Sequence, residues 1–383
     1  MIRKRITGWF CCWAALAAVG ACTDVEFGGR AEHQENAKVQ VQVDWSADTA
    51  GTAGDLCIAM SRILRSVHYV WAVDEEGGVK VLDSTDFAAP GLVGMTKAAD
   101  SVESDSTVVT AGLPEVLPGD YYVMAFNRDT ALFEVEGLGA FAADAAYSMR
   151  DLRLRVREMR QAEIDTLMDN SHADFNPSYT YIKNSGPLFL DVMKQTFTEG
   201  GVQPLRLQPE PLTQRLAFRF YVELEEGVEV ERIIGEISGV AGETELMSGT
   251  VDDSVTCRVL FPAREVSREG QTVLYEGEVN VLGLFPGKDD SFITGPGILQ
   301  LSIQARSGEY ERLFHAGINL KGTITRAGLM NALPGETGFR VAREEAVLTV
   351  EALLKIKNNQ IEPGGDGQGV EVWFDSDKID VEV

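Results

Sequence analysis

Histidine, the residue that most often binds metals and transfers protons in active sites, is scarce in this sequence. The chain has four, scattered without the spacing of a zinc site: His33, His68, His172 and His315. Ser171, His172 and Asp174 lie together, but neighbours in one loop cannot place the base between a nucleophile and a carboxylate, as a catalytic triad requires. The sequence also lacks a G-x-S-x-G motif, a phosphate-binding loop and a dinucleotide fingerprint. We therefore expect no enzyme activity, no metal and no cofactor.

Cysteine is also rare, with five residues in the chain. Cys11, Cys12 and Cys22 fall in the N-terminal segment, which leaves Cys57 and Cys257 for the folded part. Because these two are far apart in the sequence, we expect separate buried thiols rather than a disulfide. The sequence alone does not decide whether they pair.

Basic residues are few compared with acidic ones, 34 against 59, so the formal net charge is −25. Removal of residues 1–21 would delete Arg3, Lys4 and Arg5 and no acid, which takes the charge from −25 to −28. A strongly negative chain is repelled by nucleic acid and by anionic lipid headgroups. The composition therefore excludes nucleic acid as an expected partner. Whether a small molecule binds stays open.

Long apolar runs are absent except at the N-terminus, where the basic residues 3–5 precede sixteen uncharged residues, Ile6 to Ala21. This run is shorter than the ~20 apolar residues of a membrane-spanning helix and is typical of a secretory signal. It ends in Val19-Gly20-Ala21-Cys22, which resembles the site cut by lipoprotein signal peptidase. We expect cleavage between Ala21 and Cys22 and a lipid anchor, including palmitate, on Cys22. A plain secretory signal is the alternative.

The residues after Cys22 predict a location. Asp24 and Glu26 resemble the surface-export signal of Bacteroidales lipoproteins, so we expect the outer face of the outer membrane. Residues 22–36 would form a tether between lipid and fold. Several acyl chains would make such an anchor stable.

Alternating apolar and polar residues predict many short strands. The first is clear, because Val39, Val41, Val43 and Trp45 alternate with polar residues. Tyr121–Phe126 is apolar on both faces and predicts a central strand, and the last segment alternates through Ile379, Val381 and Val383. A run of helix formers predicts one short helix near Glu158–Met168. With about 350 residues after the signal, we expect two β-sandwich domains, 37–205 and 206–383, and one or two short helices.

Acidic and aromatic residues leave two further questions open. Asp252-Asp253, Asp289-Asp290 and Asp366 could bind calcium, although none follows a known calcium-loop pattern and solvated turns are expected. Tyr179, Tyr181 and Trp373 could stack on sugars, although core packing is the default for such residues.

A series of short segments, in order along nearly the whole mature chain, resembles the Bacteroidales fimbrillin superfamily, and most closely its anchor-type lipoproteins and a related uncharacterised group. After the lipobox Cys22, these segments are Val43-Asp44-Trp45, Asn176 to Ile182, Gly186 to Leu190, Leu212 to Arg215, Glu236 to Ala241, Val281 to Phe285, Ile318 to Leu320 and Gly369 to Trp373. The resemblance implies two tandem transthyretin-like β-sandwiches and a role in type V pili.

The resemblance also implies how subunits would connect. In that family a stalk subunit loses its first strand by cleavage after an arginine, and a neighbour's C-terminal strand fills the groove. Anchor members keep the first strand and the lipid. Arg62 and Arg65 are the nearest arginines after Val39–Trp45, and the last strand stops at Val383, which fits the anchor pattern better.

These observations predict a cell-surface fimbrial anchor or accessory lipoprotein that contacts pilus subunits in cell adhesion. The predicted contacts are Val39–Trp45 or Ile379–Val383. The alternatives are a surface glycan-binding lipoprotein and a polymerising stalk or tip pilin.

Overall fold

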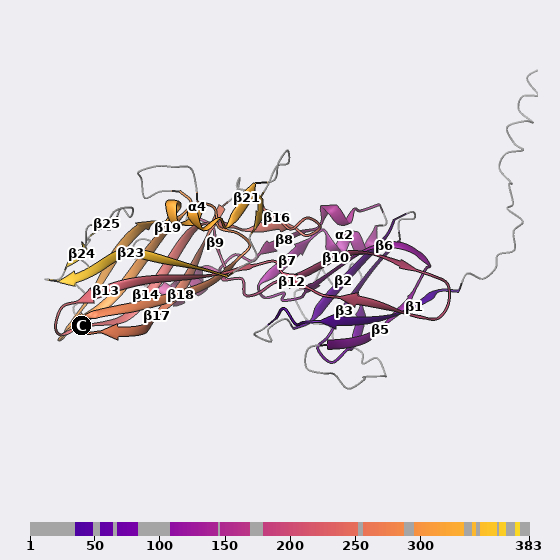
Figure 1. Ribbon diagram of the computed structural model, residues 1–383, viewed down its shortest axis with the longest axis horizontal. Coiled ribbons are helices and arrows are strands. Elements are labelled where there is room, and N and C mark those ends of the chain that lie inside the picture. Colours follow the sequence, from indigo (N-terminus) through magenta and orange to yellow (C-terminus); the bar gives the residue numbers. More distant parts are fainter. Residues whose placement is uncertain are drawn as a thin grey trace, which may run out of the picture.

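The computed structural model describes residues 35–48, 54–63, 67–82, 108–144, 146–168, 179–251, 256–286, 295–332, 339–341, 345–357, 360–364 and 372–375. The molecule is elongated, with the first strands at one end and the last strands at the other (Figure 1). Most described residues lie in strands, which confirms the predicted mainly-β fold.

Two sheets form the end that holds the first strand. Sheet A has the order β11-β1-β5, and sheet B has the order β12-β10-β6-β2-β3-β4. Their inward side chains share one core, which includes Val41 of β1, Ile58 of β2 and Tyr121 of β6. The bounds are β1 (Ala37–Asp44), β2 (Leu56–Arg62), β3 (His68–Val73), β4 (Val79–Val81), β5 (Val108–Val116), β6 (Gly119–Asn127), β10 (Phe189–Phe197), β11 (Val202–Leu207) and β12 (Glu210–Pro211).

Sheet B is buried on both faces. Alternate residues of β6, such as Val123 and Met124, belong to two different cores, one shared with sheet A and one with the rest of the molecule. This double burial explains why Tyr121–Phe126 carries apolar residues without alternation. The prediction of a central strand there is confirmed, because β6 lies between β10 and β2.

Sheet D forms the opposite end, with the order β24-β23-β13-β18-β17-β14-β19-β20-β25 and with β9 paired to β17. Phe218 and Phe261 stack in its core, and Gly235 and Gly277 leave room for the Phe261 ring, since a Cβ on either glycine would overlap it. The bounds are β9 (Tyr181–Ile182), β13 (Gln214–Leu224), β14 (Val228–Ala241), β17 (Thr256–Glu269), β18 (Thr272–Val281), β19 (Ile298–Ser307), β20 (Tyr310–Asn319), β23 (Ala346–Lys357), β24 (Gln360–Gly364) and β25 (Val372–Asp375).

Both ends of the molecule use the same local arrangement around one strand. β1 lies between an antiparallel strand, β5, and a parallel strand, β11. β13 likewise lies between antiparallel β18 and parallel β23. The two halves are therefore alike at this point, although no sequence repeat relates them.

Sheet C lies between the two ends and takes strands from both parts of the sequence, in the order β21-β22-β16-β15-β8-β7 (Figure 1). The predicted domain boundary at 205/206 stays a prediction. The bounds are β7 (Phe133–Glu136), β8 (Arg153–Val156), β15 (Glu243–Glu245), β16 (Thr250–Val251), β21 (Met330–Ala332) and β22 (Phe339–Val341).

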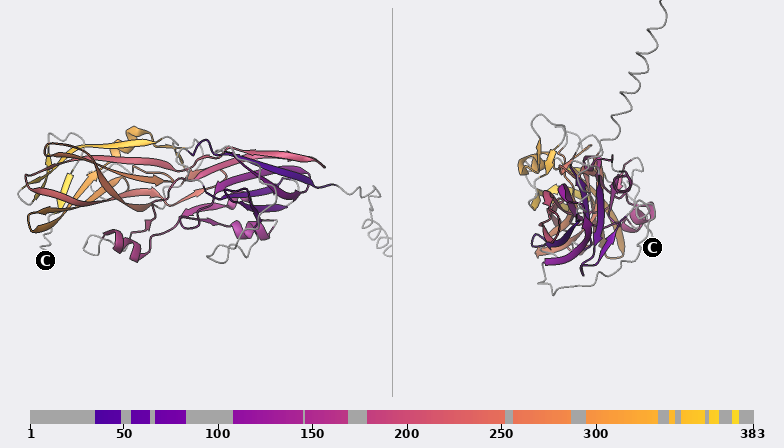
Figure 2. Two further views of the ribbon diagram at one scale, coloured as in Figure 1. Left: turned by 90° about the horizontal axis from the view of Figure 1, so that it is seen from below. Right: turned by 90° about the vertical axis from the view of Figure 1, so that its right-hand side faces the viewer.

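Three short α-helices and one 3-10 turn are present in the described part of the chain, one helix more than expected. Figure 2 shows α2 and α3 on the same side of the molecule. The helix predicted near Glu158–Met168 is present as α3. The bounds are α2 (Leu138–Ala143), η2 (Met149–Asp151), α3 (Gln161–Met168) and α4 (Lys321–Ala327).

Candidate functional site

The predicted contact strand, β1, lies in the middle of sheet A. It runs parallel to β11, from Lys38 opposite Val202 to Val43 opposite Leu207. On its other side it runs antiparallel to β5, with Val41 opposite Ala111. Both edges of β1 are therefore paired, and a further strand cannot add to it while it stays in place.

The inward face of β1 is sealed in the core. Val39, Val41 and Val43 are at most 2% exposed, whereas Gln40 and Gln42 on the other face are half-buried. Burial of three valine side chains stabilises the strand by roughly 5–9 kcal/mol as an upper estimate. The alternation in the sequence therefore marks the side chains whose burial holds the strand in place.

Trp45 fixes the end of β1 to sheet B. Its ring meets the Phe189 ring edge-on, with 5.9 Å between the ring centroids. A turn follows at once, because the Asp48 amide donates to the Trp45 carbonyl at 2.8 Å and the Ser46 amide donates to Asp44 Oδ1 at 2.9 Å. The strand therefore has a defined end at this tryptophan.

This site could bind one extended β-strand, the place that β1 now takes between β5 and β11. If β1 left, β5 and β11 would face each other with unpaired backbone amides and carbonyls along both rims. Such a groove binds an extended segment through main-chain hydrogen bonds and selects apolar side chains at every second position. We call this groove the first-strand slot, and in the structure β1 itself occupies it.

The other predicted site residues lie outside the described residues. These are Ala21 and Cys22 at the predicted cleavage site and Ile379, Val381 and Val383 in the last predicted strand. The last described strand, β25, pairs with β20 through Ile318 opposite Val372. Figure 1 places β25 and β1 at opposite ends of the molecule.

Neither rim of the slot, β5 or β11, was foreseen from the sequence. The segment with Pro204, Pro209 and Pro211 marked only the opening of the second half of the chain, yet residues Val202–Leu207 form β11 beside β1. Leu205 and Leu207 are fully buried. Their alternation with the exposed Arg206 was a strand signal, and Pro204 is compatible with it because proline is tolerated on edge strands.

A charged cluster beneath α3 is structural. Tyr181 donates from its hydroxyl to Glu236 Oε2 at 2.9 Å, Arg258 forms an ion pair with the same carboxylate, and the Arg258 guanidinium lies 3.5 Å from the Tyr179 ring centroid. Burial, followed by the nearby Glu236 charge, raises the pKa of Tyr181 above its usual value. The cluster joins β9 to β14 and β17, so it ties two distant parts of the chain together.

The residues considered for ligands give no sugar platform or metal site in the described structure. Tyr181 is buried, and Tyr179 has Arg258 over its ring. The side chain of Trp373 and the acidic residues 252, 253, 289, 290 and 366 are outside the description. Within the described ranges, no three potential ligands gather as a metal site would need, and no helix is long and apolar enough to cross a bilayer.

Cys57 and Cys257 are both buried and free, so the expectation of separate thiols is confirmed. Burial raises the pKa of Cys57 to about 12 and that of Cys257 to about 11. Because the thiolate is the reactive form, we predict that neither thiol of the folded chain reacts with iodoacetamide at pH 8 and that both react after denaturation. Mass spectrometry checks this, and labelling of either cysteine in the native protein would contradict it.

No protein-family model and no curated protein matches the chain. Solved structures that are similar include a candidate adhesin from Bacteroides ovatus, 11% identical, covering 83% of this chain and 95% of that one, with a TM-score of 0.44. A candidate polysaccharide-binding protein from Bacteroides thetaiotaomicron is 11% identical, covers 87% and 99%, and has a TM-score of 0.41. The fimbrial anchor protein Mfa2 from Porphyromonas gingivalis is 10% identical, covers 91% and 100%, and has a TM-score of 0.36.

Of these three neighbours, Mfa2 is a fimbrial anchor protein and the other two are described as an adhesin and a polysaccharide-binding protein. At such TM-scores the likeness carries no argument about function.

Proposed function

We propose that the chain is a lipid-anchored cell-surface protein that serves as the anchor or an accessory subunit of a pilus and acts by protein–protein contact. The observation that supports this most is the filled first-strand slot. If the mature protein keeps this strand, it does not accept a strand from a neighbour there, so it would stand at the end of a fibre rather than within it.

The position of β1 also fits an anchor. Ala37 follows Cys22 by fifteen residues, and an extended tether of that length spans roughly 50 Å at most. With lipid on Cys22, the β1 end would face the membrane and the β25 end would point away (Figure 1). The contact with pilus subunits would then lie toward the β25 end, where Ile379–Val383 follows in the sequence.

Replacement of the predicted lipid-bearing residue tests the anchoring part of the proposal. We predict that Cys22→Ala removes the protein from the outer-membrane fraction and that pili are shed into the medium, because the acyl chains proposed to hold it there are absent. Fractionation and immunoblotting of cells and medium measure both effects.

Cys12→Ala, within the predicted signal, is the matched control and should leave the protein in the membrane fraction. Unchanged membrane attachment of the Cys22→Ala protein would contradict lipid anchoring. Release of the protein with pili still attached to cells would leave an accessory role and exclude the anchor.

A further inference from the structure

Sheet B has an open edge at β10. β10 pairs along its length with β6, from Leu190 opposite Phe126 to Phe197 opposite Gly119. On its other side it pairs with β12 at two positions only, Phe189 opposite Pro211 and Leu190 opposite Glu210. Within the described strands, the stretch from Asp191 onward therefore has a neighbour on one side alone.

Hydrogen bonds at the start of β10 show which backbone groups face its open edge. The Leu188 carbonyl accepts from the Leu212 amide at 2.7 Å, so residue 188 faces the β12 side. The Phe189 amide donates to Asn127 Oδ1 at 2.7 Å, so residue 189 faces the β6 side. Because this direction alternates along a strand, Val192 and Lys194 present their backbone N–H and C=O groups to the open edge.

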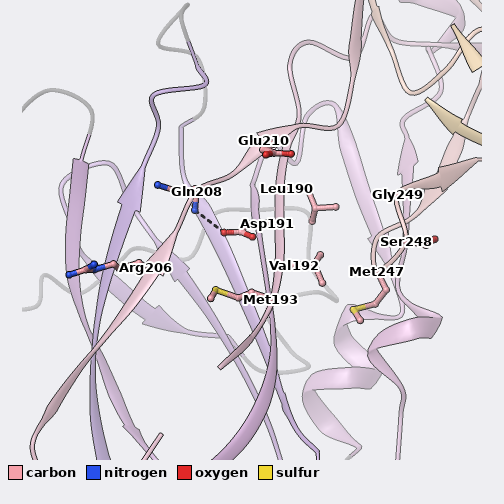
Figure 3. Close-up of a pocket in the computed structure, with 10 residues that line it drawn as sticks. All are labelled: Leu190, Asp191, Val192, Met193, Arg206, Gln208, Glu210, Met247, Ser248 and Gly249. Atoms are coloured by element: carbon pink, nitrogen blue, oxygen red, sulfur yellow. Dashed lines mark hydrogen bonds between the residues drawn. The ribbon is translucent and has the colours of Figure 1, made fainter. Parts of the chain in front are cut away.

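A cavity of about 420 Å³ lies along this edge, within the ~300–1,000 Å³ range of ligand pockets. We call it the β10 groove. Its ten lining residues come from β10, from β11 and the residues after it, and from the turn between β15 and β16 (Figure 3).

The walls of the β10 groove differ on the two sides of the strand. Leu190 and Val192 project toward the side where Met247 lies, so most of the apolar side chains gather there, while Met193 shares the other side with Asp191 (Figure 3). On the other side Asp191 Oδ2 accepts a hydrogen bond from the backbone amide of Gln208 at 2.7 Å (Figure 3). The carboxylate has several lone pairs, so it can hold this amide and a cation together.

We infer that the β10 groove binds an extended segment of another polypeptide, added to the edge of β10, in which apolar residues alternate with lysine or arginine. The open backbone edge requires an extended peptide, and the two walls require alternation. The lining has a net negative charge, because its two acids, Asp191 and Glu210, outnumber its one base, Arg206. This charge favours a basic segment. None of the ten lining residues is aromatic, which disfavours a sugar.

This site is separate from the first-strand slot and from the lipid, so it does not rest on the proposed anchoring role. The slot lies in sheet A and is filled, whereas the groove lies on the edge of sheet B. Loss of binding here would leave membrane attachment unchanged.

The test uses the full mature chain and a fluorescent octapeptide that alternates valine with lysine, with binding followed by anisotropy. The matched peptide carries N-methyl groups on alternate amides, which keeps the side chains and removes the main-chain donors. We expect the first to bind and the second to bind at least about tenfold more weakly. No binding at about 1 mM peptide, or equal binding of the two peptides, would overturn the inference.

Two variants at Val192 distinguish the contribution of its backbone amide to peptide binding from that of its side chain. Val192→Pro removes the outward amide, which β6 does not use, and we expect at least about tenfold weaker binding. Val192→Ala keeps that amide and should bind within about threefold of the parent. Asp191→Asn should weaken the lysine peptide about threefold and leave a valine–threonine peptide unchanged. If Val192→Pro does not fold, the N-methyl comparison decides, and an Asp191→Asn effect on both peptides would refute the charge selection.

Discussion

Val41→Asp is expected to destabilise the protein by about 4 kcal/mol or more, because it places an unpaired carboxylate in a sealed core. Val41 is fully buried and lies between Leu205 of β11 and Ala111 of β5. The new carboxylate would be cut off from water in the first-strand slot, so β1 should leave the slot. The core between sheets A and B should then open. Urea unfolding measures the loss, and limited proteolysis detects the released strand.

Gln42→Asp is the control, because it adds the same charge one residue away on the half-buried face. Gln42 lies opposite Arg206, so the new carboxylate gains a favourable neighbour. We expect a change within about 0.5 kcal/mol. Equal destabilisation by the two substitutions would mean that β1 is not held by its inward side chains.

Glu236→Ala is expected to cost about 3–5 kcal/mol, since it leaves the guanidinium of Arg258 buried without its partner. Both side chains of this ion pair are largely buried, at 11% and 13% exposed. The substitution also removes the acceptor of the Tyr181 hydroxyl. Chemical denaturation measures the loss, and amide exchange should rise in β9 and α3, which this cluster holds against β14 and β17.

An exposed ion pair provides the comparison. Arg155 on β8 pairs with Glu136 and Glu243 at 3.3 and 3.2 Å, but its side chain is 54% exposed. We expect Arg155→Ala to cost about 0–1 kcal/mol. The double variant Glu236→Leu, Arg258→Met should recover stability relative to Glu236→Ala. A small effect of Glu236→Ala, similar to that of Arg155→Ala, would contradict the role of this cluster in holding β9 to β14 and β17.

The elements with a strong local pattern were predictable. β1 and β13 bury every second residue, so their period of two shows directly in the sequence. The stretch Tyr121–Phe126 was identified as central because it lacks alternation, and the structure buries it on both faces. α3 followed from a run of helix formers without glycine or proline.

The pairing of distant segments was not predictable from local pattern. β11 runs parallel to β1 although more than 150 residues separate Val43 from Val202, and nothing in either strand encodes that neighbour. Sheet C consists of short strands, such as β15 and β16, whose two or three residues are too few to show a period. The β10 groove depends on where β12 leaves β10, which is a property of the assembled sheet.

We propose that the mature chain keeps its own first strand in the first-strand slot while lipid holds Cys22. Intact-mass and N-terminal analysis of the protein from its native envelope tests it most directly. We predict a lipid-modified Cys22 followed by an uncut chain through Val383. An unlipidated chain that begins after an arginine and lacks Val39–Trp45 would contradict the claim and identify a polymerising subunit.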